Sequence, residues 1–122
     1  MKHSRRITAI ALVMLLMASA GFGNVAHAEL RVVDGNLWAA SSMAEKRAYL
    51  IGVANTVAVN RALQAKRGNV DPQSVNSRIE MALDADTIDR AIGRIDAWYA
   101  ANPSQKSAPV LGVIWTSMVK GH

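Results

Sequence analysis

The sequence predicts a small all-α protein, a single-domain bundle of about four helices that follows a cleavable signal peptide. Three observations lead to this prediction. The chain begins with a basic and then apolar leader, its later part contains helix-capping motifs, and apolar residues recur there at helical spacing. The 122 residues include no cysteine, so the fold must rely on its apolar core without disulfide bonds.

The leader has the three parts of a secretory signal peptide. Basic residues come first, an apolar run follows from Ile7 to about Phe22, and Ala26-His27-Ala28 supplies the small residues that signal peptidase accepts. Cleavage would fall before Glu29, which predicts a signal peptide at 1–28 and a helical domain at 29–122. A membrane-spanning helix, the alternative, needs about 20 apolar residues, and this run is shorter. No stable membrane anchor is therefore expected after cleavage.

The charge of the predicted domain is nearly balanced. Of the 14 basic residues, Lys2, Arg5 and Arg6 belong to the leader, which leaves 11 against 9 acidic residues. This small surplus gives no electrostatic footprint for nucleic acid, so no nucleic-acid partner is expected. The leader predicts export by the general secretory route to the periplasm, with secretion from the cell as the alternative.

Two helix starts are marked in the first half of the predicted domain. Asp34-Gly35 can cap a short helical turn that carries Trp38. Ser42-Met43-Ala44-Glu45 is a capping box, in which the Ser hydroxyl and the Glu carboxylate each accept a hydrogen bond from a free backbone amide. The helix that it opens is predicted to run to about Arg67 and to end at Gly68 in a left-handed conformation.

Three further helices are predicted. Asp71-Pro72 combines an N-cap with a proline at the first helical position, and a break near residues 84–86 ends that helix. Asn102-Pro103 ends the next one, because the residue before proline disfavours helical geometry. Residues 109–120 are predicted as a final helix, with a β-strand as the alternative because of their β-branched content. The strongest periodic signal belongs to the helix that Asn102-Pro103 ends. It comprises Ile88, Ala91, Ile92, Ile95, Trp98 and Tyr99.

The long helix predicted over residues 43–67 is apolar on most of its sides. Such a helix is normally surrounded, so we expect it to lie centrally, with Gly52 allowing a neighbour to approach closely. Asn55 falls inside its apolar arc. One interpretation is a buried amide that fixes how two helices pack, and the other is a polar contact at the floor of a ligand pocket.

Residue types needed for catalysis or metal binding are scarce. Beyond the leader the chain contains no cysteine and one histidine, His122, so neither a metal centre nor a cofactor is expected. No internal histidine can serve as the base for a nucleophilic serine or threonine. Asp84, Asp86 and Asp89 surround a predicted helix start, where capping accounts for carboxylates better than acid–base catalysis does. The sequence therefore predicts no catalytic, cofactor-binding or metal-binding residue, and no enzyme.

The aromatic side chains are the candidate interaction residues. Trp98 and Tyr99 are adjacent on a helix and point about 100° apart, so that one ring can cover the core while the other lies at its rim. Aromatic residues are frequent anchors in protein interfaces. Together with Trp38, Tyr49 and Asn55, they form the predicted set of interaction or pocket residues.

Several short motifs spread over nearly all of the predicted domain carry a family resemblance. They are Trp38, Ser42-x-x-Glu45-Lys46, Tyr49-Leu50-x-Gly52, Ile95-Asp96-x-Trp98-Tyr99-x-x-Asn102-Pro103 and Pro109-Val110-Leu111. In these motifs the chain resembles small exported proteins of proteobacteria, which mostly have no assigned function. Its layout also loosely resembles the periplasmic immunity proteins of the Tai/Rap group, which neutralise type VI amidase effectors. That resemblance implies a helical fold and an inhibitory role, although the cysteine pair typical of those proteins is missing here.

These observations predict a non-enzymatic interaction factor: an adaptor, an inhibitor or an immunity-like protein that binds another envelope protein. The alternative is a periplasmic carrier that holds a small apolar ligand among the helices near Asn55. A periplasmic chaperone ranks last, because the balanced charge and the few histidines provide no pH trigger. The sequence leaves the partner and the oligomeric state open.

Overall fold

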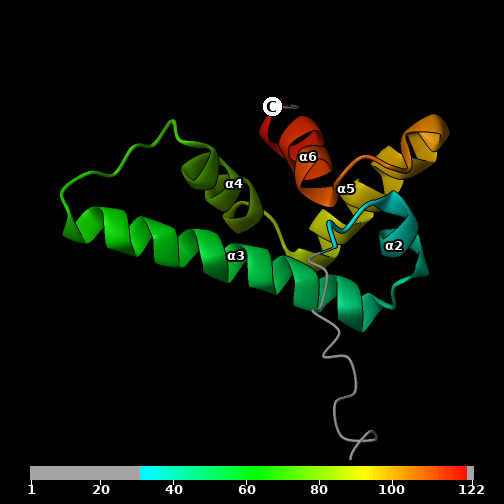
Figure 1. Ribbon diagram of the computed structural model, residues 1–122, viewed down its shortest axis with the longest axis horizontal. Helices are drawn as coiled ribbons and strands as arrows, with labels where there is room; N and C mark the ends of the chain where they lie inside the picture. Colours follow the sequence, from blue (N-terminus) through cyan, green and yellow to red (C-terminus); the bar gives the residue numbers. More distant parts are fainter. Residues whose placement is uncertain (1–30, 121–122) are drawn as a thin grey trace, which may run out of the picture. The chain divides into compact units, whose positions relative to one another are not determined.

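The computed structural model describes residues 31–120, and these residues form helices α2 to α6 around one apolar core (Figure 1). Within this range there is no β-strand, and the backbone pairing of Asp34 with Pro109 is an isolated bridge. The prediction of a small all-α bundle is confirmed. The predicted signal peptide at 1–28 lies outside the described residues, and the compact unit that contains the helices begins at Val32.

The short helix α2 (Gly35–Ala40) begins at the cap that the sequence predicts. Asp34 Oδ1 accepts a hydrogen bond from the backbone amide of Leu37 at 3.0 Å. This hydrogen bond holds the pKa of the Asp34 carboxyl below its ordinary value, because it favours the charged carboxylate. The helix carries Trp38 into the core, where its side chain is only 2% exposed.

The long helix α3 (Met43–Lys66) opens with the predicted capping box. Ser42 Oγ accepts a hydrogen bond from the amide of Glu45 at 3.1 Å, and Glu45 Oε2 accepts one from the amide of Ser42 at 2.7 Å. Gly68 follows the helix with a φ of 66°, the left-handed conformation that the sequence predicts. Both ends of α3 are therefore determined by local hydrogen bonding and backbone geometry.

Helix α4 (Val75–Asp84) begins later than the sequence predicts. Asp71 does not cap it, because Asp71 Oδ1 accepts a hydrogen bond from the amide of Gln73 at 2.9 Å and closes a turn before the helix. Ser74 is the N-cap instead, and its Oγ accepts a hydrogen bond from the amide of Ser77 at 3.2 Å. The predicted start at Asp71-Pro72 is wrong, since the Asp71 side chain satisfies a loop amide and not a helix amide.

Helix α5 (Ile88–Ala101) confirms the helix that the sequence predicts to end at Asn102-Pro103. Thr87 is its N-cap, while the neighbouring Asp86 forms ion pairs with Arg90 at 4.0 Å and with Arg94 at 3.4 Å. The helix ends at Asn102, ahead of the short 3₁₀-helix η1 (Pro103–Gln105), as the proline predicts.

The C-terminal segment is helical, so the strand alternative for residues 109–120 is not adopted. Helix α6 (Val110–Ile114) continues directly into a π-helical turn, η2 (Trp115–Val119). At the start of α6 the amide of Val110 donates a hydrogen bond to the carbonyl oxygen of Val33 at 2.9 Å. This bond joins the C-terminal helix to the segment that leads into α2.

Helix α5 and the C-terminal helix provide the centre of the core, together with Leu50 and Val57 of α3. Apolar side chains of these elements exclude water most completely, and this burial is the main stabilising contribution in a chain without disulfides. Those exposed by 1% or less are Leu50, Ala91, Ile92, Ile95, Val110, Val113, Ile114 and Met118.

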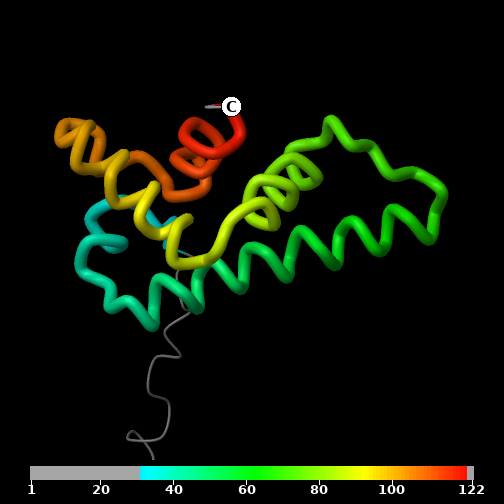
Figure 2. Tube along the Cα trace, turned by 180° about the vertical axis from the view of Figure 1, so that it is seen from behind, coloured from blue at the N-terminus to red at the C-terminus, as the bar shows by residue number. Residues whose placement is uncertain are grey.

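The prediction that the long helix lies centrally is wrong. Helices α4 and α6 lie on the same side of α3 in both views (Figures 1 and 2). Away from them, the side chains of Ile51, Val59 and Leu63 remain 48%, 60% and 48% exposed. The cause is a mismatch of lengths: α3 has 24 residues, whereas α4 has 10 and α5 has 14, so the shorter helices cannot surround it.

The close approach predicted at Gly52 occurs at a different glycine. A Cβ at Gly52 would have no neighbouring atom within 4 Å, because this residue faces open space. At buried Gly35, a Cβ would collide with the ring of Tyr99 and would lie 2.8 Å from the carbonyl oxygen of Lys106. The junction of α2 and α5 therefore requires glycine at position 35.

We expect Gly35→Ala to destabilise the protein by about 1–3 kcal/mol, because the added methyl group must displace Tyr99 or backbone. Gly52→Ala is the matched control. It removes a glycine from an exposed helix position and should stabilise the protein by about 0.5–1 kcal/mol. Urea unfolding of both variants measures the difference, and equal effects would contradict the assigned contact.

Candidate functional site

The predicted aromatic residues meet inside the protein. The rings of Trp38 and Tyr49 pack edge to face with their centroids 6.0 Å apart, and those of Trp98 and Tyr99 do so at 5.3 Å. Trp38 and Tyr99 belong to the buried core, whereas Tyr49 and Trp98 are half-buried against it. The structure therefore places all four residues in packing contacts between helices.

The carboxylate of Asp96 links three helices, because it binds both Trp38 of α2 and Lys46 of α3. The indole Nε1 of Trp38 donates a hydrogen bond to Asp96 Oδ1 at 2.7 Å, and Lys46 Nζ donates to the same oxygen at 3.1 Å. The Lys46 ammonium also lies 5.3 Å from the centroid of the Trp38 ring, within range of a cation–π interaction. The Lys46 side chain is only 12% exposed, so these partners replace much of the water around its ammonium group.

The two adjacent aromatic residues of α5 divide between core and rim, as the sequence predicts. Tyr99 is 9% exposed, and its hydroxyl donates a hydrogen bond to the carbonyl oxygen of Ala108 at 2.6 Å. Trp98 is half-buried, and its carbonyl oxygen accepts a hydrogen bond from the Asn102 side chain at 2.8 Å. Burial raises the pKa of both Tyr49 and Tyr99, because their ionised forms would lose hydration.

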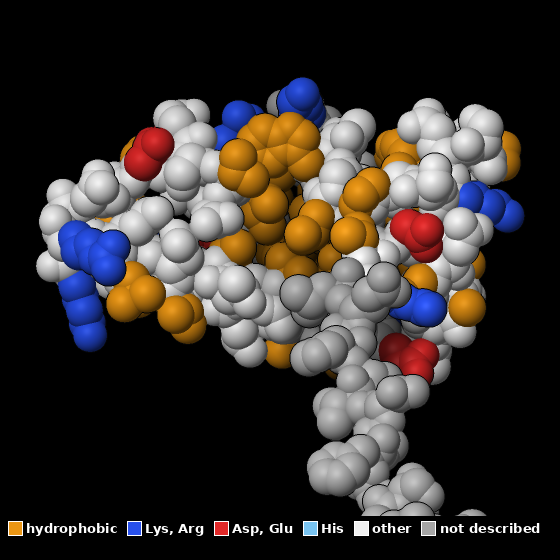
Figure 3. All heavy atoms as spheres, in the orientation of Figure 1, with side chains coloured by type: hydrophobic (Ala, Val, Ile, Leu, Met, Phe, Trp, Pro, Cys, Tyr) orange, Lys and Arg blue, Asp and Glu red, His pale blue; other side chains and the backbone are white. Residues whose placement is uncertain are grey.

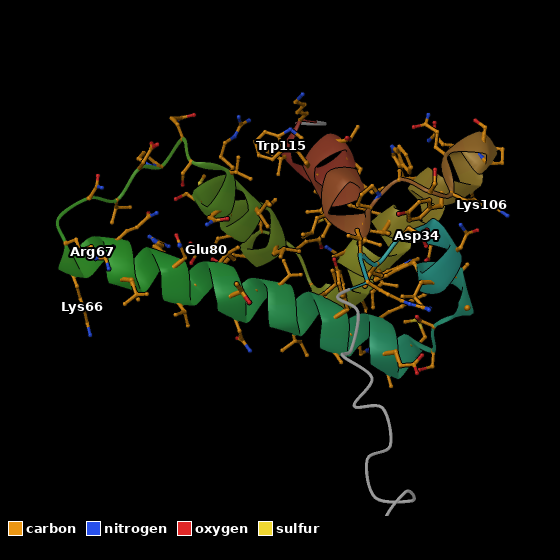
Figure 4. The ribbon with its side chains drawn as sticks, in the orientation of Figure 1. Asp34, Lys66, Arg67, Glu80, Lys106 and Trp115 are labelled. Carbon is orange, nitrogen blue, oxygen red and sulfur yellow. The ribbon has the colours of Figure 1, made fainter. Side chains whose placement is uncertain are left out.

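A recess of about 330 Å³ lies beside this aromatic junction. Its walls combine apolar atoms with two lysines and one carboxylate, and Figure 4 labels one of the lysines, Lys106. Two of the charged residues on its wall, Lys46 and Asp96, already pair with each other. It is lined by Gly35, Trp38, Ala39, Lys46, Asp96, Tyr99, Ala100 and Lys106.

Asn55 is not the buried amide that the sequence predicts. It is exposed on α3, at the edge of a depression of about 310 Å³ between α3 and the end of α4. Three carboxylates, those of Glu80, Asp84 and Asp86, line this depression, which makes it unsuitable for an apolar ligand. The prediction failed because the apolar arc around Asn55 is the uncovered side of α3 and not its core side.

A largely apolar recess lies elsewhere, between α4 and the C-terminal helix. We call it the methionine groove; it has a volume of about 270 Å³ and opens to solvent. Figure 3 shows apolar side chains gathered in a hollow between these two helices, below Trp115, which Figure 4 labels. It is lined by Arg78, Met81, Ala82, Ala85, Met118 and Val119.

The rim and walls of the methionine groove have the composition of a binding surface. The Arg78 guanidinium lies 4.9 Å from the centroid of the Trp115 ring, and the Met81 side chain is 62% exposed. Arginine, tryptophan and methionine are all enriched in protein interfaces, and methionine adapts readily to the shape of a partner. Trp115 also begins the π-helical turn η2, a distortion found frequently at functional sites.

The sequence of α4 contains a pattern for this groove, on a different face of the helix from its core residues. Helix α4 directs Ile79 and Leu83 into the core. Arg78, Met81 and Ala82 recur at i, i+3 and i+4, so they share a second face of the same helix. Trp115 and Met118 could not be connected with that face from the sequence, because they approach it only in the folded protein.

Comparisons with known proteins give no match, so the function must be argued from the geometry. No family model matches the chain, and neither a curated protein nor a solved structure matches it. Over residues 31–120, none of the helices combines the length and the hydropathy that crossing a membrane requires.

We expect Asp96→Ala to lower the free energy of unfolding by about 1–2 kcal/mol. The substitution leaves the Trp38 indole without an acceptor and the mostly buried Lys46 without its counter-ion. Asp84→Ala is the control, because Asp84 is exposed at the C-terminal end of α4, where a carboxylate opposes the helix dipole. Tryptophan fluorescence during urea unfolding measures both, and a neutral Asp96→Ala would refute the junction.

The protein should also lose stability in alkali. The pKa values of Tyr49 and Tyr99 are raised in the folded state, so their contribution is present below the ordinary pKa of 10.0 and is lost as the pH rises above it. Tyr99→Phe removes one of these two groups and should make the alkaline loss shallower, while costing about 1 kcal/mol at neutral pH through the lost hydrogen bond. Unfolding curves of the natural chain and of Tyr99→Phe at neutral and alkaline pH test this prediction. Equal losses of stability in the two proteins would contradict it.

Proposed function

We propose that this protein is an exported, non-enzymatic interaction factor that binds another envelope protein through the methionine groove. The observation that carries this proposal is the groove itself, an open apolar recess between two helices with arginine, tryptophan and methionine at its surface. A recess of this form fits the apolar side chains of a partner helix or loop.

Export is supported by the leader pattern. A basic start, an apolar run and the Ala26-His27-Ala28 site together are typical of a signal peptide, and the compact unit begins at Val32, close behind the predicted cut. The proposed compartment is the periplasm.

An interaction role agrees better with the available side chains than catalysis does. His122 is the single histidine after the leader, cysteine is missing from the whole sequence, and the mostly buried Lys46 is held in an ion pair with Asp96. The groove is lined by one arginine and by apolar residues, which can bind but offer no general acid or base.

Among interaction factors, the resemblance to immunity proteins favours an inhibitor over an adaptor. Most of the residues that carry this resemblance have structural roles in this chain. Ser42 and Glu45 form the capping box, Lys46 and Asp96 hold Trp38, and Asn102 follows the last turn of α5. The resemblance therefore supports the helical plan, and the choice of partner rests on the groove.

The second candidate function is a carrier of a small apolar ligand in the same groove. Its volume of about 270 Å³ is close to the lower end of the range for ligand pockets, roughly 300 Å³. Native mass spectrometry of protein isolated from its host separates the two functions, because a carrier retains a defined additional mass.

We expect Met81→Glu to abolish capture of the partner in an affinity pull-down from the host's periplasm. The introduced carboxylate would have to be buried against apolar surface when the partner binds. Leu37→Glu is the control, since Leu37 is also an exposed apolar helix residue but lies on α2. Mass spectrometry of the captured proteins gives the readout, together with circular dichroism to confirm that both variants are folded.

One periplasmic protein captured by the natural chain and by Leu37→Glu, but lost with Met81→Glu, would support the proposal. The same protein captured equally by all three would move the binding site away from the groove. An empty capture by the natural chain, with an additional mass in the native spectrum, would favour the carrier.

A further inference from the structure

One face of α3 is apolar and uncovered along most of the helix. It includes Ile51 and Val59, which are 48% and 60% exposed, and its middle residue, Asn55, borders the depression at the end of α4. No charged residue lies on this face between Ala48 and Ala62, over a length of about 21 Å at 1.5 Å per residue. An uncovered apolar stretch of this length on a small protein marks an interaction surface. We call it the outer face of α3: Ala48, Ile51, Asn55, Val59, Ala62 and Lys66, all exposed.

The outer face is symmetric about Asn55. Ile51 and Val59 each lie four residues from Asn55, and Ala48 and Ala62 each lie seven residues from it. When two such helices pair antiparallel, positions equally distant from the centre come opposite each other. Large β-branched residues would then meet each other, and alanine would meet alanine. Such self-complementarity is what an interface between two identical copies requires.

The charges at the two ends of α3 are complementary in the same arrangement, with one oxygen of Glu45 also accepting the capping hydrogen bond from Ser42. Glu45 lies in the first turn of α3 and Lys66 in its last turn, and Figure 4 shows Lys66 directed away from α4. In an antiparallel pair Glu45 of each copy would lie near Lys66 of the other copy, which gives two equivalent contacts. The helix dipoles would also oppose each other favourably.

Two arginines beside the outer face already form ion pairs within one copy. Arg47 forms an ion pair with Asp89 at 2.8 Å, and Arg61 forms one with Glu80 at 3.3 Å. Their positive charges would therefore give little repulsion between two copies. The exposed amide of Asn55 would lie at the centre, where each copy can donate a hydrogen bond to the other and fix the register.

We propose that two copies of this protein pair through the outer face of α3, antiparallel, with the two-fold axis beside Asn55. The methionine groove is lined by no residue of α3, so it stays open in each copy. The proposal is independent of the binding function assigned to that groove. It gives the protein two grooves per dimer, an arrangement that strengthens binding to a dimeric or clustered partner.

Cysteine cross-linking of the full chain tests this arrangement, since the natural sequence has no cysteine to interfere. Asn55→Cys should form a covalent dimer under mild oxidation, because the two-fold axis brings the two thiols together. Ala48→Cys alone should remain monomeric on a denaturing gel, because its two thiols would be about 21 Å apart. A mixture of Ala48→Cys and Ala62→Cys should give the covalent heterodimer. Gln105→Cys on the exposed η1 is the control for random collision.

Sedimentation equilibrium of cysteine-free protein provides the second measurement. The natural chain should be a dimer, Ile51→Glu and Val59→Glu should each weaken dimerisation at least tenfold, and Met81→Glu in the groove should leave it unchanged. A natural chain that remains monomeric throughout overturns the proposal. So does a dimer that Ile51→Glu leaves intact, or cross-linking of Ala48→Cys with itself, which would indicate a parallel pair. Loss of dimerisation with retained groove binding, or the reverse, separates this proposal from the proposed function.

Discussion

Helices of unequal length leave parts of this small fold uncovered. A 24-residue helix, about 36 Å long, packs against helices of 10 and 14 residues, and these two helices pack in turn against the short C-terminal helix. These elements bury one side of α3 and leave apolar residues exposed on the other. They also meet each other incompletely, so that an apolar groove remains between α4 and the C-terminal helix. Both proposed binding surfaces are consequences of this mismatch.

Without disulfides, the N-terminal part of the fold is held by a polar junction as well as by the core. Asp96 accepts hydrogen bonds from Trp38 and Lys46, and it thereby joins α2, α3 and α5 at one carboxylate oxygen. Gly35 permits the ring of Tyr99 to lie directly against α2. Most residues that first suggested an interaction site are committed to this junction, which leaves binding to the surfaces beyond it.

The two proposed surfaces differ in the chemistry that they offer. The methionine groove is concave, with flexible side chains and a cation stacked on an indole ring, which suits an adaptable contact with a different protein. The outer face of α3 is convex, made of small and β-branched residues, and symmetric about Asn55, which suits rigid packing against an identical helix. The proposed dimer would carry two free grooves.

The sequence by itself determined the class of fold and most helix boundaries. The capping box at Ser42 and Glu45, the left-handed Gly68 and the stop at Asn102 were predictable because each depends on hydrogen bonds or backbone angles within a few residues. The start of α4 was mispredicted for a related reason, since Asp71 had two local amides available and bound the one in the loop.

Only the tertiary structure decided which side of α3 is covered. Apolar residues surround most of that helix, so its sequence does not distinguish the core side from the exposed side. The choice depends on where α4, α5 and α6 pack, which is set by contacts between residues far apart in the chain. For the same reason Asn55 was expected inside and lies outside. The groove at Arg78, Met81 and Trp115 could not be predicted either, because Trp115 is remote in sequence and only the fold brings it to the other two.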